Sequence, residues 1–134
     1  MKIAMVIVRT LMGLLFLMSS VTFFLMMNGV MAMPEMPDGP LKTFNEGLAA
    51  SSYFFILLKV TEFVCGLLLL IGRYVPLAMV ILSPIIINIV LTHLFLMPSG
   101  IGPGLFLAFG NIFLAYYYRD AFKPLLTSKY EPYR

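Results

Sequence analysis

The chain has 134 residues, of which 61% are hydrophobic and only 11% are charged, with a net charge of +3. Soluble domains are about 45–50% apolar and about 25% charged, so this composition excludes an ordinary soluble domain, a disordered chain and a coiled coil. The length predicts one domain, residues 1–134. Because the sequence has no Gly-rich phosphate loop and no basic patch interleaved with aromatics, we expect no nucleic-acid partner.

Four apolar segments follow one another along the chain, at about residues 3–27, 51–71, 74–97 and 102–121. A helix needs about 20 residues to cross the ~30 Å hydrocarbon core of a bilayer. The sequence therefore predicts an all-α protein, an integral membrane four-helix bundle in direct contact with the lipid bilayer, with residues 122–134 as a short tail. The first segment is too long for a signal peptide and Arg9 interrupts it, so we interpret it as a span.

The loop between the first two spans carries a further helix signal. Asp38-Gly39-Pro40 is typical of a helix start with proline in the first turn. Leu41, Phe44 and Leu48 then recur at helical spacing. We expect a short helix that lies on the outer surface of the membrane.

Basic residues predict the orientation. Seven basic residues would lie on one side of the membrane and only Lys42 on the other; the seven are Lys2, Arg9, Arg73, Arg119, Lys123, Lys129 and Arg134. Lys and Arg accumulate on the cytoplasmic side of membrane proteins. Both termini are therefore predicted to be cytoplasmic.

The second span contains two charged residues, Lys59 and Glu62. A charge at mid-membrane costs roughly 2.5–3.5 kcal/mol on the insertion scale, so both side chains should face protein. Their spacing of three residues places them on one helix face, where they can pair. Ionisable residues within spans usually mark function; the alternative is an ion pair that only fixes helix register.

Asn88 in the third span and Asn111 in the fourth are predicted to lie at a similar depth in the membrane. At 1.5 Å per residue, Lys59 lies about 12 Å and Glu62 about 16 Å below the outer boundary, and both asparagines lie near mid-depth. We expect these four side chains to meet in a ligand-binding cluster. The alternative for the two asparagines is interhelical hydrogen bonding.

Arg9 and His93 are the outer members of this predicted cluster. Arg9 lies about 9 Å inside the inner boundary and is expected to reach toward Glu62; the alternative is snorkelling to the inner headgroups. His93, about 6 Å inside the outer boundary, is interpreted as a hydrogen-bond donor or proton relay. It points about 140° away from Asn88, which favours an interfacial histidine as the alternative.

Metal chemistry is not expected. The single cysteine, Cys65, excludes an intrachain disulfide, and no Cys/His cluster suits zinc. Met31, Met33 and Met36 are the kind of soft ligands that hold copper(I), but methionine is also a common gap filler in apolar chains. A lone His93 cannot supply both axial ligands of a haem.

Several short motifs, in this order and spacing, resemble the DoxX family of small four-helix membrane proteins. They are Arg9 with Gly13, Lys59-x-x-Glu62, Gly66-Leu67-Leu68-Leu69-Leu70, Gly72-Arg73, Val75-Pro76-Leu77-Ala78, Ser83-Pro84-Ile85-Ile86-Ile87-Asn88-Ile89 and His93-Leu94-Phe95. The outer loop with its prolines and Phe44 is similar too.

The resemblance implies a redox setting in the bacterial cytoplasmic (inner) membrane. Some members of the family are linked to thiosulfate:quinone oxidoreductase, and others are membrane anchors of oxidoreductase complexes. We therefore expect a membrane subunit that binds a quinone or similar amphipathic molecule for an oxidoreductase partner subunit. The sequence carries no redox centre of its own, and no catalytic assignment transfers. A non-catalytic scaffold, a small transporter and a homo-oligomer stay open as alternatives.

Overall fold

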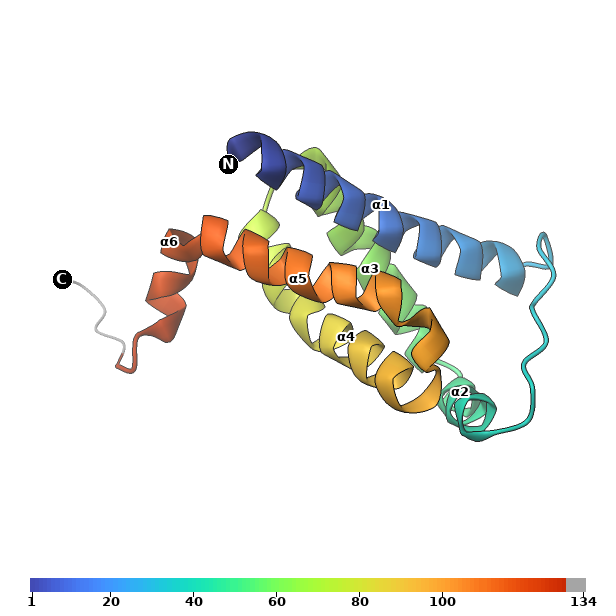
Figure 1. The fold of residues 1–134 in the computed structure, drawn as a ribbon. Helices are drawn as coiled ribbons and strands as arrows, with labels where there is room; N and C mark the ends of the chain where they lie inside the picture. The colour runs from blue at the N-terminus through green and yellow to red at the C-terminus, as the bar shows by residue number, and fades with distance from the viewer. Residues whose placement is uncertain (130–134) are drawn as a thin grey trace.

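The computed structural model describes residues 1–129, and the regular elements of this part of the chain are all helices, without strands (Figure 1). The helices are α1 (Lys2–Met27), α2 (Pro40–Ala50), α3 (Phe54–Ile71), α4 (Val75–Leu96), α5 (Ile101–Tyr117) and α6 (Arg119–Phe122), with short 3₁₀ turns at Pro98–Gly100 and Lys123–Leu126. Four of them are long and apolar enough to cross a membrane: α1, α3, α4 and the continuous stretch Pro98–Tyr117. The predicted all-α protein with four membrane-spanning helices is thus confirmed.

Local chain geometry decides where the spans begin and end. Ser52 has a positive φ of 67°, which keeps it out of the helix, and the Ser51 hydroxyl accepts a hydrogen bond of 3.1 Å from the Phe54 amide. α3 therefore begins at Phe54 rather than at the predicted 51. α5 ends at Tyr117, short of the predicted 121, because the chain leaves helical geometry at Tyr118 before α6.

The four long helices form a closed arrangement in which each one packs on two neighbours. α1 packs on α3 and α5, and α4 packs on the same two helices from the other side. The tightest contact joins α1 and α3, where Gly13 and Gly66 face each other: a Cβ added to Gly13 would lie 2.8 Å from the Gly66 carbonyl oxygen. Glycine at both positions lets the two backbones approach closely.

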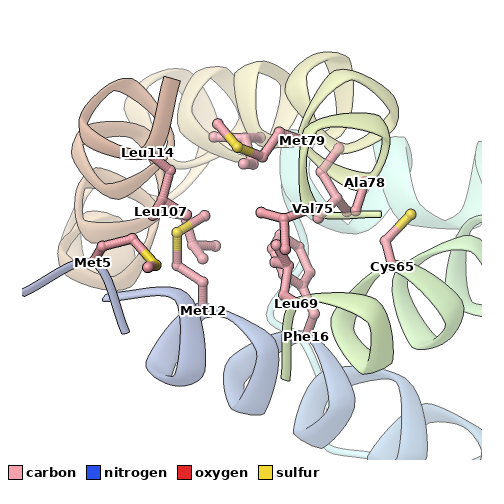
Figure 2. Close-up of a cluster of buried hydrophobic side chains, with 12 residues drawn as sticks. Met5, Met12, Phe16, Cys65, Leu69, Val75, Ala78, Met79, Leu107 and Leu114 are labelled. Atoms are coloured by element: carbon pink, nitrogen blue, oxygen red, sulfur yellow. The ribbon is translucent and has the colours of Figure 1, made fainter. Parts of the chain in front are cut away.

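The hydrophobic core occupies one half of this bundle. Figure 2 shows the buried side chains from α1, α3, α4 and α5 pointing toward one another. Phe16, Leu69, Met79 and Leu114 are among the largest fully buried ones. Because these residues come from the beginning of α1 and α4 and from the end of α3, the core lies near the end of the bundle where α1 starts and α5 ends. We call this the terminal end.

The opposite end, which we call the α2 end, is built differently. α2 contacts α3 and α4 and has no buried residue. In Figure 1 it lies beyond the long helices, away from the start of α1. The helix that Asp38-Gly39-Pro40 predicted is therefore present, and its first turn carries an ion pair of 3.1 Å between Lys42 and Asp38.

The outer surface of the long helices is apolar. Large hydrophobic side chains on every long helix are more than half exposed, including Ile7, Leu57, Ile87, Phe109 and Ile112. Soluble monomers rarely expose such contiguous apolar surface. Lipid tails would cover it, which agrees with a protein embedded in the bilayer.

Candidate functional site

A cavity of about 690 Å³ opens at the α2 end, between α2, α3 and α4. Its walls are mainly apolar, with Phe44 and Leu48 contributed by α2, Phe55 by α3, and Ile85 and Ile89 by α4. The chain thus packs its core tightly at the terminal end and leaves space at the other. The polar side chains that line the cavity are Ser19, Asn45, Lys59, Thr61, Glu62, Asn88 and Thr92.

Glu62 is the most unusual of these side chains. Its side chain is only 3% exposed, and it is the one charged residue that is buried within residues 1–129. The Lys59 ammonium lies 3.0 Å from Glu62 Oε2, as the i,i+3 spacing predicted, and the Lys59 side chain is itself mostly buried. Lys59 Nζ also donates a hydrogen bond of 2.8 Å to Ser19 Oγ on α1. Two helices therefore hold this charge pair.

One atom of this pair is not satisfied. Glu62 Oε2 is buried, and no donor among the described residues makes a hydrogen bond of good geometry to it, although the Lys59 ammonium balances its charge. A carboxylate oxygen can only accept hydrogen bonds. Among the described residues, the Lys59 ammonium is therefore the polar group on which this buried oxygen depends.

Asn88 forms part of the opposite wall, on α4. Its Nδ2 donates a hydrogen bond of 3.2 Å to the Pro84 carbonyl oxygen, one turn earlier in the same helix. The side chain is exposed, at a depth where the surroundings are apolar. Thr92, one turn further on, lines the same cavity. The structure thus brings Asn88 to the same cavity as Lys59 and Glu62.

Asn111 does not join them, contrary to the expectation from depth alone. Its Nδ2 donates a hydrogen bond of 3.0 Å to Ser83 Oγ, which links α5 to α4. It lines a separate, smaller cavity of about 310 Å³ that Phe122 and Leu125 also border. The reason lies in the packing order: α5 packs on α1 and α4, diagonally across from α3.

Arg9 also lies elsewhere than expected. Its guanidinium packs against Gly72, at the turn between α3 and α4. α1 and α3 run antiparallel and cross at Gly13 and Gly66, so Arg9 is level with Gly72 rather than with Glu62. Ten residues of α3 separate these two levels, which is about 15 Å. The expected reach toward Glu62 is therefore wrong.

His93 faces α5 rather than the cavity. Its Nδ1 lies 2.8 Å from the Ile89 carbonyl oxygen of its own helix. The ring packs beside Gly100 and Gly104, where a Cβ added to Gly100 would lie 3.0 Å from His93 Cδ2. His93 thus lies outside the cavity, in the direction that its angular offset from Asn88 predicts, and its partner is a carbonyl oxygen of α4 rather than of a loop.

Sequence reasoning missed two contributors to the cavity. Ser19 accepts the Lys59 hydrogen bond, yet a serine in an apolar span gives no signal until the register of α1 on α3 is known. Phe44 and Leu48 of α2 were recognised as a helical repeat, but the spacing does not reveal that they line a cavity. Within residues 1–129, no three His, Cys, Asp or Glu side chains come together as a metal site would require.

Four apolar helices around a packed core, with a charged pair at membrane depth, define an integral membrane protein of the four-helix type. The chain belongs to the DoxX family: the family model for DoxX matches residues 4–95, more than half of the chain. All residues that line the larger cavity fall within this match. Neither the curated proteins nor the solved structures that were searched gave a match.

Proposed function

We propose that this DoxX protein is the membrane subunit or anchor of a redox system and binds a quinone or similar amphipathic molecule in the cavity between α2, α3 and α4. The observation that carries the proposal is the buried Lys59–Glu62 pair, which opens onto an apolar space of about 690 Å³. Binding sites for small molecules are typically apolar, about 300–1,000 Å³ in volume, with a few polar groups that fix orientation. The cavity has both the apolar volume and the few polar groups of such a site.

Three polar side chains of the cavity have a role in this proposal. Lys59 and Glu62 set the charge of the binding site, and Asn88 offers its carboxamide to a polar head group. His93 and Asn111 take no direct part, since they line other surfaces. Because the sequence supplies no redox centre, we assign electron transfer to a partner oxidoreductase. We place the protein in the bacterial inner membrane with both termini cytoplasmic.

The test is the quinone content of the purified full chain in mild detergent, measured from solvent extracts by the redox difference spectrum. The wild-type protein should retain quinone, and Glu62→Gln should retain several-fold less because the charge pair is lost. Glu35→Gln, the same chemical change in the exposed loop before α2, is the matched control. Equal quinone content in wild type and a folded Glu62→Gln variant would rule the proposal out.

One observation favours a second candidate, a non-catalytic scaffold. Lys59 bridges α3 to α1 through Ser19 and so contributes to packing as well as to the cavity. A scaffold predicts that replacing Lys59 and Glu62 together by methionine leaves co-purification of a partner and its activity intact. Loss of activity with partner binding retained would favour the ligand-binding proposal instead.

A further inference from the structure

Arg9 of α1 carries a positive charge that has no counter-charge within residues 1–129. None of the three ion pairs in this part of the chain includes it; they join Lys42 to Asp38, Lys59 to Glu62 and Lys123 to Asp120. The Arg9 Nε is buried and has no hydrogen-bond partner. The side chain as a whole is only half-buried, so its terminal nitrogens can reach a partner outside the chain. The guanidinium is therefore able to bind an anion that the described chain does not supply.

Gly72, at the end of α3, makes room for this guanidinium. Its φ of 85° lies in the left-handed region that glycine adopts readily. A Cβ added to Gly72 would lie 2.9 Å from Arg9 Cζ and nearer still to Nη1, so the guanidinium occupies the space that a side chain would fill. Arg73, the next residue of the turn, is exposed and forms no ion pair within residues 1–129. One turn thus brings together two arginines without a counter-charge.

The surroundings of this turn favour an anion from the lipid. The turn joins two membrane-spanning helices, α3 and α4, and so lies at the edge of the hydrocarbon core. α4 begins here with no acidic residue in its first turn and no side-chain cap, so the partial positive charge of its first amides adds to that of the arginines. At this depth a bilayer offers the phosphate groups of its lipids. A guanidinium can bind phosphate through two parallel N–H···O bonds.

We propose that Arg9 and Arg73 bind the phosphate of an anionic phospholipid, with Gly72 as the residue that positions the Arg9 guanidinium. A lipid that also carries an ammonium group suits the site less, because the one acidic residue described at this end, Asp120, already pairs with Lys123 at 2.8 Å. The site is separate from the larger cavity, since Gly72 lies about 15 Å along α3 from Glu62. The inference therefore does not depend on the proposed function.

Lipid titration of the purified full chain in detergent, followed by native mass spectrometry, tests the inference. Dioleoylphosphatidylglycerol and dioleoylphosphatidylcholine share their acyl chains and their phosphate, and only the second carries an ammonium group. We expect the first bound phosphatidylglycerol to have a several-fold lower dissociation constant than phosphatidylcholine. Equal dissociation constants would overturn the inference. Displacement of the lipid by millimolar inorganic phosphate would show that the site takes a free anion, and would overturn its assignment to a lipid.

Variants of the two arginines locate the site. Arg9→Gln should weaken phosphatidylglycerol binding about tenfold, the factor that a hydrogen bond to a charged group supplies. Arg9→Lys keeps the charge but loses the two parallel bonds, so it should bind more weakly than wild type; binding equal to wild type would contradict a guanidinium site. If Arg9→Gln does not fold, Arg73→Gln on the exposed side of the turn should weaken binding several-fold, and unchanged binding there would contradict the assignment.

Arg119→Gln is the matched control, because it removes the same charge at the same end of the molecule. Arg119 already has partners: its Nη1 donates a hydrogen bond of 2.9 Å to the Tyr116 carbonyl oxygen, and its guanidinium lies 4.6 Å from the centre of the Tyr116 ring. This variant should therefore bind phosphatidylglycerol as wild type does. An equal loss of binding in Arg9→Gln and Arg119→Gln would show attraction by net charge alone and would overturn the site.

Discussion

Lys59 and Glu62 carry opposite charges at a depth where neither would be stable alone. Removing one member of a buried pair leaves the other uncompensated, at a typical cost of about 3–5 kcal/mol, whereas replacing both by apolar residues is often close to neutral. A buried ion pair is stable only with close geometry and additional hydrogen bonds. The contact of 3.0 Å between the two side chains supplies the first, and the hydrogen bond from Lys59 to Ser19 contributes to the second.

We therefore expect Lys59→Met to destabilise the protein strongly, by roughly 3 kcal/mol or more, because Glu62 remains buried without a counter-charge. Thermal unfolding in detergent, followed by circular dichroism, measures the change. The double replacement of Lys59 and Glu62 by methionine should recover most of the lost stability. A single variant as stable as wild type would show that the pair contributes little.

At the scale of helices, the contact between α1 and α3 sets the geometry of the site. Gly13 and Gly66 fix which residues of the two helices are level, and this register places Ser19 beside Lys59 and Arg9 beside Gly72. A methyl group at Gly13 would lie 2.8 Å from a backbone oxygen, which cannot move without moving the helix. The cavity therefore depends on a contact outside it.

Gly13→Ala is expected to lower stability by about 1–3 kcal/mol, the usual cost of overpacking, and to weaken ligand binding with it. Gly102→Ala is the matched control, because nothing lies within 4 Å of a Cβ added there. Unfolding in mixed detergent compares the two. Equal stability of the two variants would argue against close packing of α1 on α3.

The positions of the helices along the chain can be predicted from the sequence, but the rotation of each helix about its own axis in the bundle cannot. Hydropathy predicts four spans because bilayer thickness fixes their length, and the i,i+3 spacing predicts the Lys59–Glu62 pair because a single helix determines it. Asn111 shows the limit: depth along a helix says nothing about which neighbour the side chain faces. That direction depends on which helices are adjacent, and adjacency is set by packing across the whole bundle.

The whole molecule is packed unevenly, with a dense core at the terminal end and a cavity at the α2 end. The DoxX match covers all the cavity-lining residues but ends before α5. The cavity is thus built entirely from the part of the chain that defines the family. α5 closes the bundle on the far side, where it holds α4 through Asn111 and Ser83.

The orientation of this asymmetric molecule is a prediction from charge, with the terminal end cytoplasmic. In a Cys65→Ala background, Glu46→Cys on α2 should react with a membrane-impermeant maleimide added to intact cells. Ser128→Cys, in the tail, should react only after the cells are opened. The opposite labelling pattern would place the cavity on the cytoplasmic side.

The most direct measurement of the central claim is photo-crosslinking in liposomes with a decylhydroquinone that carries a diazirine on its ring, read out by peptide mass spectrometry. A ligand in the cavity predicts labelling within residues 54–62 of α3 and 84–92 of α4, abolished by excess unlabelled decylhydroquinone. Labelling spread over lipid-facing residues such as Phe109 and Ile112, without competition, would show that the probe only dissolves in the bilayer and would contradict a binding site at Glu62.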